Sequence, residues 1–326
     1  MTNHHTRRNL LRTASALALS AATVLAEDSG AAQTGIERVG GPALKVSLNA
    51  YSFSKLLNDF NKHREGGGIS LMQLLDFCAK NNFDGIDPTG YFFPGYPEVP
   101  TDEYVNNFKR RAFELGLGIS GTGVRNNFTT SDKSVRDASV QHIKQWVEVA
   151  SRLGAPVLRV FADTQRKNMS WHDVAKDRTR EQVQQWIVDD LSQCAEQGKK
   201  FGVIIGVQNH GDFLQTGEQL LSLIKAVGSP WCGAIVDTGY FKTNDPYLDM
   251  AKVAPFAVNW QIKQSAFGQE SEVRTDLKKL IQIIRASNYR GYLPIETLSP
   301  RGKVYDPFTV VPAFHKELRA AIQEVS

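Results

Sequence analysis

The sequence predicts an α/β protein in which eight parallel strands close into a single barrel. Short apolar runs alternate with amphipathic segments from about residue 44 to residue 325, and regular alternation of this kind is typical of a parallel sheet. Eight apolar runs are present, a number that favours closure over an open sheet. One such barrel commonly takes ~250 residues, and the chain of 326 residues is long enough to supply them.

The predicted strands are short and apolar, and several follow a Gly or Asn that can end the preceding helix, as at 81–85 and 287–291. They are expected at Leu44–Asn49, Phe83–Asp87, Gly118–Thr122, Val157–Phe161, Val203–Gln208, Gly233–Asp237, Val258–Ile262 and Leu293–Glu296.

Segments with helical spacing of apolar residues lie between these strands. Longer loops, around 58–68, 91–100 and 163–177, are expected at the catalytic end of the barrel, where they could shape a pocket. The helices are expected at Ser70–Asn81, Thr101–Leu115, Ser134–Leu153, Thr179–Phe201, Thr216–Val227, Pro246–Val253, Asp276–Ser287 and Val310–Val325.

The N-terminus has the layout of a secretory signal. A twin-arginine start at 6–12 precedes an apolar run at 14–25 and a cleavage-like end at Ala26. The run of ~12 apolar residues is too short to span a bilayer comfortably. We therefore expect a twin-arginine signal peptide at 1–26, a flexible spacer at 27–42 and the barrel at 43–326. The mature protein would be periplasmic or otherwise exported, with no stable membrane span.

Charge and cysteine content narrow the function further. Cleavage removes Arg7, Arg8, Arg12 and no acid, so the net charge falls from +4 to +1. No remaining Lys/Arg cluster indicates a nucleic-acid partner. An odd number of widely spaced cysteines, three in all, predicts neither a disulfide framework nor a zinc motif. A homo-oligomer is possible, but no sequence feature locates an interface.

Four late strands end in side chains that can bind a metal: Gln208, Asp237, Gln261 and Glu296. The carboxyl ends of the strands of a closed barrel converge on one mouth, where active sites lie. Four oxygen donors there, two of them carboxylates, suit a hard divalent cation.

The order of these strand ends resembles the sugar phosphate isomerase/epimerase superfamily, which has the xylose isomerase-like (β/α)8 TIM barrel. The motifs are Gln-Asn-His-Gly at 208–211, Val-Asp-Thr at 236–238, Gln-Ile-Lys at 261–263 and Ile-Glu at 295–296. The resemblance covers about residues 44–325 and implies one divalent metal ion (Mn, Mg, Co or Ca) at the four positions above. The family often has Glu at position 208 and usually His at position 261, so Gln at both lowers the ligand charge.

The resemblance also implies an isomerase or epimerase that abstracts a proton next to a sugar carbonyl. Family members use two glutamates on opposite faces of an enediolate, and an amide at 208 cannot accept a proton. Glu296 is therefore the expected base, with His210 and Lys263 as candidates for the second acid or base. A one-base site also suits β-elimination by a keto-glycoside lyase or hydratase. A non-catalytic sugar-binding protein is an alternative of another class.

The expected partner is a small sugar or glycoside, and export favours an unphosphorylated one. Arg159 lies within an apolar strand, where a guanidinium needs a partner such as a substrate oxygen. Weaker candidates for substrate contact are Arg125, Asn126, Asn49 and Tyr51. Tyr91, Phe92, Trp260 and Phe128 could supply an aromatic face for a sugar ring, although core packing is their simpler interpretation.

Overall fold

A computed structural model describes residues 35–63, 67–166, 168–265, 273–298 and 304–325. The predicted signal peptide and residues 27–34 of the predicted spacer lie outside the described residues. Residues 35–42 contact the barrel: the Ile36 N–H donates to Pro255 O at 2.9 Å, and Arg38 Nη2 donates to Ala257 O at 2.6 Å. This part of the predicted spacer is therefore held against the barrel and is not a free linker.

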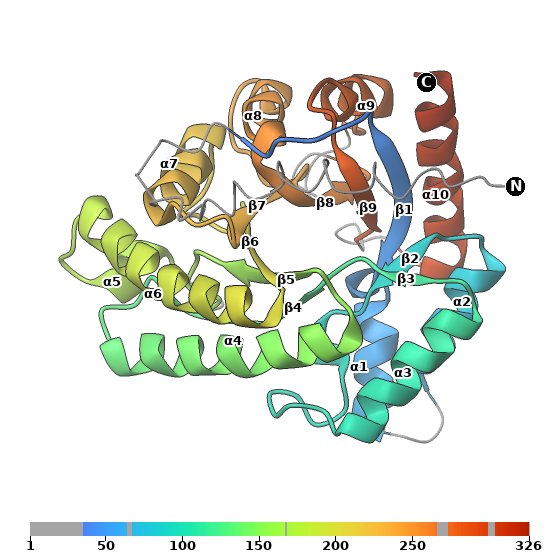
Figure 1. Ribbon diagram of the computed structural model, residues 1–326, viewed down its shortest axis with the longest axis horizontal. Coiled ribbons are helices and arrows are strands. Elements are labelled where there is room, and N and C mark those ends of the chain that lie inside the picture. The colour runs from blue at the N-terminus through green and yellow to red at the C-terminus, as the bar shows by residue number, and fades with distance from the viewer. Residues whose placement is uncertain (1–34, 64–66, 167, 266–272, 299–303, 326) are drawn as a thin grey trace, which may run out of the picture. The chain divides into compact units, whose positions relative to one another are not determined.

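The described chain forms one closed sheet of parallel strands surrounded by helices, which confirms the predicted barrel (Figure 1). The strand order is β3-β2-β1-β9-β8-β7-β6-β5-β4. Its two end strands, β3 and β4, are separated in the chain only by Ser120 and Gly121, so the sheet closes on itself. The strands are β1 (Ala43–Asn49), β2 (Gly85–Asp87), β3 (Gly118–Ile119), β4 (Thr122–Gly123), β5 (Val157–Phe161), β6 (Ile204–Gln208), β7 (Cys232–Asp237), β8 (Ala257–Lys263) and β9 (Arg290–Glu296).

The strand predicted at Gly118–Thr122 is divided into β3 and β4, and residues 118–123 are called the seam below. Asn259 Nδ2 of β8 crosses the barrel interior and donates to Ser120 O at 3.1 Å. A Cβ at Gly121 would lie 3.0 Å from the same amide nitrogen, a tight contact that glycine avoids. Two residue pairs join β2 to β3 and two join β4 to β5, whereas six join β1 to β9.

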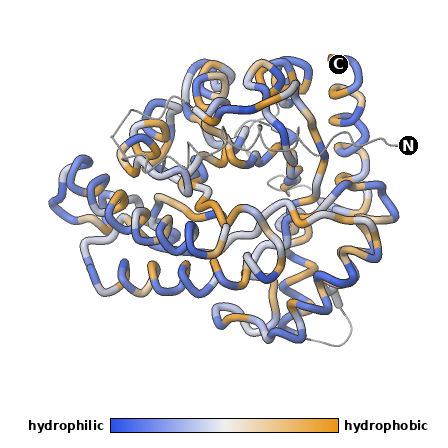
Figure 2. Tube along the Cα trace, viewed as in Figure 1, coloured by the Kyte–Doolittle hydropathy of each residue, from blue (hydrophilic) through white to orange (hydrophobic). Residues whose placement is uncertain are grey.

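Amphipathic helices cover the outside of the barrel, and hydrophilic and hydrophobic residues alternate along them (Figure 2). Ser70, Thr179 and Thr216 cap their helices, and in each case a glutamine three residues later returns the hydrogen bond. The helices are α1 (Ser54–His63), α2 (Leu71–Lys80), α3 (Asp102–Glu114), α4 (Lys133–Leu153), α5 (Trp171–Ala175), α6 (Arg180–Phe201), α7 (Gly217–Val227), α8 (Pro246–Val253), α9 (Leu277–Ala286) and α10 (Pro307–Glu324), with 3-10 turns η1 (Ala50–Phe53), η2 (Gly90–Phe92) and η3 (Ala254–Phe256).

Two of these helices lie where the sequence predicts loops. Helix α1 enters the segment predicted as a loop at 58–68, and α5 lies within 163–177. Ser170 and Asp173 form a capping box at the start of α5, a signal that the loop prediction did not weigh. None of the helices within the described ranges combines the length and apolar character needed to cross a bilayer.

The turn η2 carries Tyr91 to the mouth of the barrel. A Cβ on Gly90 would lie 2.9 Å from a ring atom of Trp146, a fully buried residue of α4, so only glycine allows this approach. Phe93 packs edge-to-face against the same indole, with ring centroids 5.6 Å apart. Core packing therefore fixes the turn and, with it, the position of Tyr91.

Candidate active site

A cavity of about 120 Å³ lies at the mouth of the barrel. Active sites in closed α/β barrels lie at this end. Eight residues singled out from the sequence line the cavity: Tyr51, Tyr91, Arg125, Arg159, Gln208, His210, Lys263 and Glu296. Gln165, Tyr240 and Leu298 line it as well.

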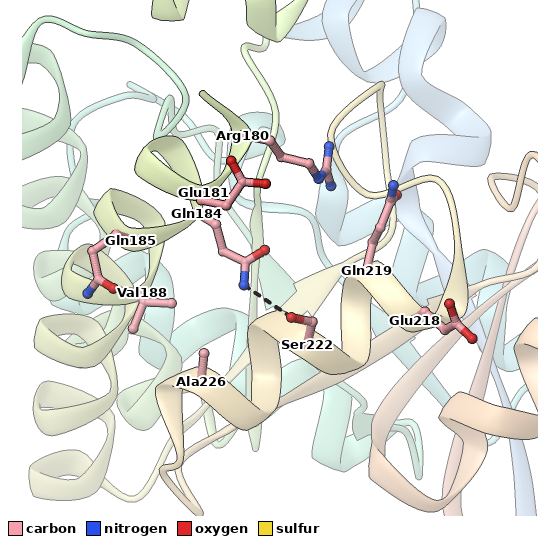
Figure 3. Close-up of a pocket in the computed structure, with 9 residues that line it drawn as sticks. All are labelled: Arg180, Glu181, Gln184, Gln185, Val188, Glu218, Gln219, Ser222 and Ala226. Carbon is pink, nitrogen blue, oxygen red and sulfur yellow. Dashed lines mark hydrogen bonds between the residues drawn. The ribbon is translucent and has the colours of Figure 1, made fainter. Parts of the chain in front are cut away.

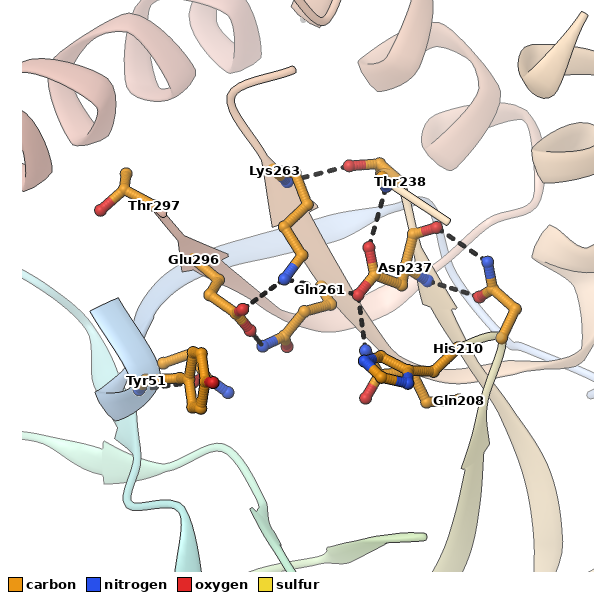
Figure 4. Close-up of polar contacts among 12 residues, drawn as sticks. Tyr51, Gln208, His210, Asp237, Thr238, Gln261, Lys263, Glu296 and Thr297 are labelled. Atoms are coloured by element: carbon orange, nitrogen blue, oxygen red, sulfur yellow. Dashed lines mark hydrogen bonds and ion pairs between the residues drawn. The ribbon is translucent and has the colours of Figure 1, made fainter. Parts of the chain in front are cut away.

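Lys263 lies at the centre of the polar cluster beneath the cavity (Figure 4). Its ammonium group donates a hydrogen bond to Glu296 Oε1 and lies 3.6 Å from Asp237 Oδ2. The three residues end the adjacent strands β7, β8 and β9 and are at most 5% exposed. The structure therefore brings the two predicted carboxylate ligands together around an internal cation.

The two glutamines of the cluster donate hydrogen bonds to these carboxylates. Gln208 Nε2 donates to Asp237 Oδ2 at 2.5 Å, and Gln261 Nε2 donates to Glu296 Oε2. Arg159 Nη1 donates to Gln208 Oε1 at 3.1 Å. The orientation of Gln208 follows from its two neighbours, because a flipped amide would place its oxygen against a carboxylate and its NH2 against a guanidinium.

The protonation of the cluster follows from burial and from these contacts. Burial lowers the pKa of Lys263, but its attraction to Asp237 and Glu296 is stronger, and the pKa is raised overall. Burial raises the pKa of Glu296, yet Lys263 and Gln261 outweigh this and hold the pKa below its ordinary value. Burial raises the pKa of Asp237, and Lys263 offsets that effect only in part. Lys263 is therefore a cation and Glu296 a carboxylate at neutral pH.

These residues do not fit a divalent ion in the manner predicted. The amide oxygens of Gln208 and Gln261 were expected as ligands, but their N–H groups face the carboxylates, and an N–H group repels a cation. Lys263 Nζ lies between the two carboxylates and pairs with both.

His210 forms a pair with Asp163, a residue that the sequence reasoning missed. His210 Nδ1 lies 2.5 Å from Asp163 Oδ2, and Gln165 Nε2 donates to the other oxygen of this carboxylate at 2.6 Å. The imidazole packs between Phe161 and Tyr240, with centroid distances of 4.8 and 4.3 Å. Asp163 engages Nδ1, so Nε2 is the ring nitrogen available to a substrate in the cavity.

Two arginines and Tyr91 form the opposite side of the cavity. Arg159 Nη2 donates to the Tyr91 hydroxyl at 2.5 Å, and the guanidinium of Arg125 lies 4.6 Å from the centroid of the same ring. Arg159 is 4% exposed, whereas Arg125 is exposed at the rim. Arg159, Arg125 and Tyr51 all line the cavity, and their contact with a substrate stays a prediction.

The other two predicted substrate contacts have structural partners instead. Asn126 donates through Nδ2 to Phe161 O at 2.7 Å and accepts from Phe161 N at 2.8 Å. Asn49 Oδ1 accepts from the Tyr51 N–H at 2.8 Å and caps η1. Neither residue lines the cavity. Both ends of the Asn126 amide bond backbone, so its predicted role is corrected. Asn49 bonds backbone through Oδ1 alone, and its contact with substrate stays a prediction.

A second depression lies on the outside of the barrel between α6 and α7 (Figure 3). It has a volume of about 520 Å³ and is lined mainly by polar side chains; Gln184 Nε2 donates to Ser222 Oγ across it at 3.1 Å. None of the predicted site residues borders it. The mouth of the barrel is therefore the candidate active site.

Comparison with known proteins agrees with this architecture. The family model described as "xylose isomerase-like TIM barrel" matches residues 75–320. The fold is similar to 3-keto-D-glucoside 4-epimerase YcjR from E. coli, with a TM-score of 0.65 and 14% identity over 86% of this chain and 99% of that one. It is also similar to an L-ribulose 3-epimerase, with a TM-score of 0.68 and 16% identity over 86% of this chain and 95% of that one.

A D-psicose 3-epimerase, solved in the presence of D-fructose, gives a TM-score of 0.66 at 13% identity, over 86% of this chain and 97% of that one. No curated protein matches the sequence significantly. At such low identities the solved structures show a shared fold, whereas the family model spans most of the barrel itself. The chain therefore belongs to the xylose isomerase-like TIM barrel family.

Proposed function

We propose that the protein is a sugar isomerase or epimerase that removes a proton from the carbon next to a carbonyl group. The observation that carries this proposal is the pairing of two proton-transfer groups on one cavity. An ionised Glu296 lies at one side, and the His210–Asp163 pair lies at another. The names of similarly folded proteins, which are sugar epimerases, support the same reaction class.

Glu296 is the proposed base. Its carboxylate takes the proton, and the electron pair of the C–H bond moves toward the carbonyl oxygen to form an enediolate. The ammonium group of Lys263 has three donors, two of which face Glu296 and Asp237, and the third can donate to that oxygen. As Lys263 attracts the developing oxyanion, its hold on Glu296 weakens and the carboxylate becomes more basic.

His210 is the proposed acid that returns a proton. Protonated at Nε2, it delivers the proton to the carbon face opposite Glu296, which inverts the configuration. In an isomerisation it delivers the proton to the neighbouring carbon, and the hydroxyl proton of the enediolate moves to the former carbonyl oxygen as the new carbonyl forms. Asp163 stabilises the positive charge on the ring while His210 is protonated. Water then removes the proton from Glu296 and restores the one on His210, so the site returns to its starting state.

An unphosphorylated sugar or sugar derivative is the proposed substrate. The twin-arginine start of the chain supports an exported protein, and sugar phosphates are chiefly cytoplasmic. The cavity also offers Tyr91 and Tyr51 as aromatic surfaces and Arg159 as a donor, a combination that suits the hydroxyl groups and apolar faces of a sugar ring.

Exchange of carbon-bound hydrogen with deuterated water tests the proposal. Purified protein is incubated with ketohexoses and 3-keto-glucosides, and deuterium uptake is followed by NMR and mass spectrometry. Glu296→Gln is expected to lower the exchange rate by about 10²–10⁴-fold. Glu218→Gln, the matched change at the exposed outer depression, is expected to leave it within about twofold.

Other products would identify other functions. A released aglycone with an unsaturated keto-sugar would indicate β-elimination, and the protein would then be a lyase on the same barrel. Saturable sugar binding without exchange for any compound would indicate a binding protein. Equal exchange by Glu296→Gln and the unaltered protein would remove Glu296 from the role of base.

A further inference from the structure

The ammonium group of Lys263 lies at the point where strands β7, β8 and β9 direct their last carboxylates. It contacts Glu296 Oε1 directly and lies 3.6 Å from Asp237 Oδ2. At 2% exposure, Lys263 is screened from water, and its ammonium group lies 5.7 Å from the centroid of the Tyr240 ring. A buried lysine needs compensating charge, and here two carboxylates supply it.

The carboxylate oxygens of the cluster already accept hydrogen bonds, which leaves none of them free for a second cation. Arg159 donates to Gln208 Oε1, and Gln208 Nε2 in turn donates to Asp237 Oδ2. The remaining Asp237 oxygen accepts from the Gly239 N–H at 2.8 Å. Both Glu296 oxygens also have donors, from Lys263 and Gln261. Every carboxylate oxygen of the cluster therefore already faces an N–H group.

The charge balance of the cluster also disfavours an added divalent ion. Lys263 and Arg159 bring two positive charges, and Asp237, Glu296 and the Asp87 carboxyl that attracts Arg159 can bring three negative ones. A divalent ion added to this set would leave an excess of positive charge in a buried site. Buried charge without a counter-ion is strongly unfavourable, so a metal ion would have to displace the lysine.

The backbone after β7 is shaped to hold the lysine stem. A Cβ on Gly239 would lie 2.8 Å from Lys263 Cγ, so glycine makes the space that the methylene chain fills. Thr238 Oγ1 accepts from the Lys263 N–H at 2.9 Å and fixes the base of the side chain. The surrounding residues therefore hold the Lys263 side chain in one conformation and fix the position of its ammonium group.

We propose that the ammonium group of Lys263 occupies the cation position of this site, so that the protein performs its chemistry with a built-in cation and without a divalent metal. The lysine contributes one positive charge and three N–H donors between the two carboxylates. It stabilises negative charge on a substrate oxygen by hydrogen bonding. Only the catalytic part of this inference rests on the proposed function, because occupancy of the cation position can be measured without turnover.

Metal binding by the full mature chain gives the first test. The unaltered protein, treated with a chelator and then titrated with Mn²⁺, is expected to bind less than about 0.1 equivalent, followed by the electron paramagnetic resonance of free Mn²⁺ and by elemental analysis. Its thermal midpoint is expected to stay the same with and without Mn²⁺. One equivalent of bound Mn²⁺ that is lost in Asp237→Ala would overturn the proposal. This arm needs no variant of Lys263.

Lys263→Met gives the second test, because methionine has a similar length and no charge. The two carboxylates then lack their cation, and the variant is expected to gain about one equivalent of Mn²⁺ and a higher thermal midpoint when Mn²⁺ is added. Lys252→Met, at an exposed lysine paired with Glu218 on the outer helices, is the control and is expected to gain neither. A folded Lys263→Met protein that still ignores Mn²⁺ would refute the assignment of the cation position to Lys263.

The two proposals fail separately. Absence of hydrogen exchange with every sugar would count against the proposed function, while the Mn²⁺ titrations would still decide the cation position. Conversely, a metal-loaded active protein would contradict the built-in cation and leave the sugar chemistry standing.

Discussion

Asp163 Oδ2 lies 2.5 Å from Nδ1 of His210, and the two residues follow neighbouring strands, β5 and β6. The contact depends on Gly211, since a Cβ there would lie 2.6 Å from the same carboxylate oxygen. The backbone of Gly211, with φ of +72°, also lies in the left-handed region that favours glycine. The local sequence after β6 therefore provides both the imidazole and the space for its partner.

Asp163→Asn tests the role of this pair. An amide has no charge with which to stabilise a protonated imidazole, so we expect kcat to fall by about 10²-fold with little change in KM. Steady-state kinetics on the substrate found by the exchange screen would measure both. Asp189→Asn, at an exposed acid on α6, is the control. A loss confined to KM would show that Asp163 positions substrate rather than His210.

Lys263→Met tests the electrostatics of the cluster through stability. Removing one partner of a buried ion pair costs about 3–5 kcal/mol, so the free energy of unfolding is expected to drop by that order at pH 7.5. The loss should shrink toward pH 5, because in the variant protonation of Asp237 and Glu296 removes the unpaired negative charge. Urea unfolding at both pH values provides the measurement. An equal loss at both would mean that packing, and not charge, dominates the effect.

Replacement of Asp87, at the end of β2, is expected to raise the free energy of unfolding, whereas Lys263→Met is expected to lower it. Burial raises the pKa of this carboxyl to about 6, and attraction to Arg159 offsets this only in part. The ordinary Asp pKa in an unfolded chain is about 3.9. The folded state therefore binds more protons between these values, and stability falls as pH rises from about 4 to 6 and stays lower above that.

Asp87→Asn removes this cost because the amide resembles the protonated acid. We expect the variant to be more stable than the unaltered protein by on the order of 1–3 kcal/mol at pH 7.5, with little difference at pH 4. Chemical denaturation at the two pH values would show it. A variant that is less stable at pH 7.5 would mean that the ion-pair contribution of Arg159 exceeds the burial cost.

Gly239→Ala tests the space around the lysine stem. The new Cβ would come within 2.8 Å of Lys263 Cγ, and relieving such overpacking typically costs 1–3 kcal/mol. We expect both a lower thermal midpoint and a loss of activity, because the ammonium group has to move. Gly41→Ala, where a Cβ would meet no atom within 4 Å, is the matched control. Unchanged activity in Gly239→Ala would indicate that the lysine can shift without consequence.

The barrel and the residues at its mouth could be predicted from the chain, because strand ends that alternate with helices leave few arrangements. Asp237 and Glu296 converge as the strand pattern predicts. The orientation of the Gln208 amide could not be predicted, because either its oxygen or its NH2 group can face a given neighbour. The positions of Arg159 and Asp237 decide this orientation.

Other differences from the predictions have similar physical causes. Asn126 was expected to bind substrate, but its amide matches the donor and acceptor of the Phe161 backbone, and sequence position does not distinguish these two uses. Asp163 lies two residues beyond the end of β5. The rule that identified the metal-ligand candidates, a polar side chain at a strand end, would have found Asp163 if applied slightly further along the chain.

Residues that line the cavity come from two parts of the barrel, the strands β6–β9 and the segments beside the seam at residues 118–123. The strands β6–β9 carry His210, Lys263 and Glu296 on or beside them. Tyr91 and Arg125 belong to segments that follow β2 and β4, beside the seam. Arg125 is exposed at the rim, so changes of sequence around it can accumulate with little disturbance of the proton-transfer groups. A lineage that keeps the groups on β6–β9 can acquire new sugar preferences through the loop at Arg125, and this loop is the natural region to randomise when the specificity of this scaffold is to be redesigned.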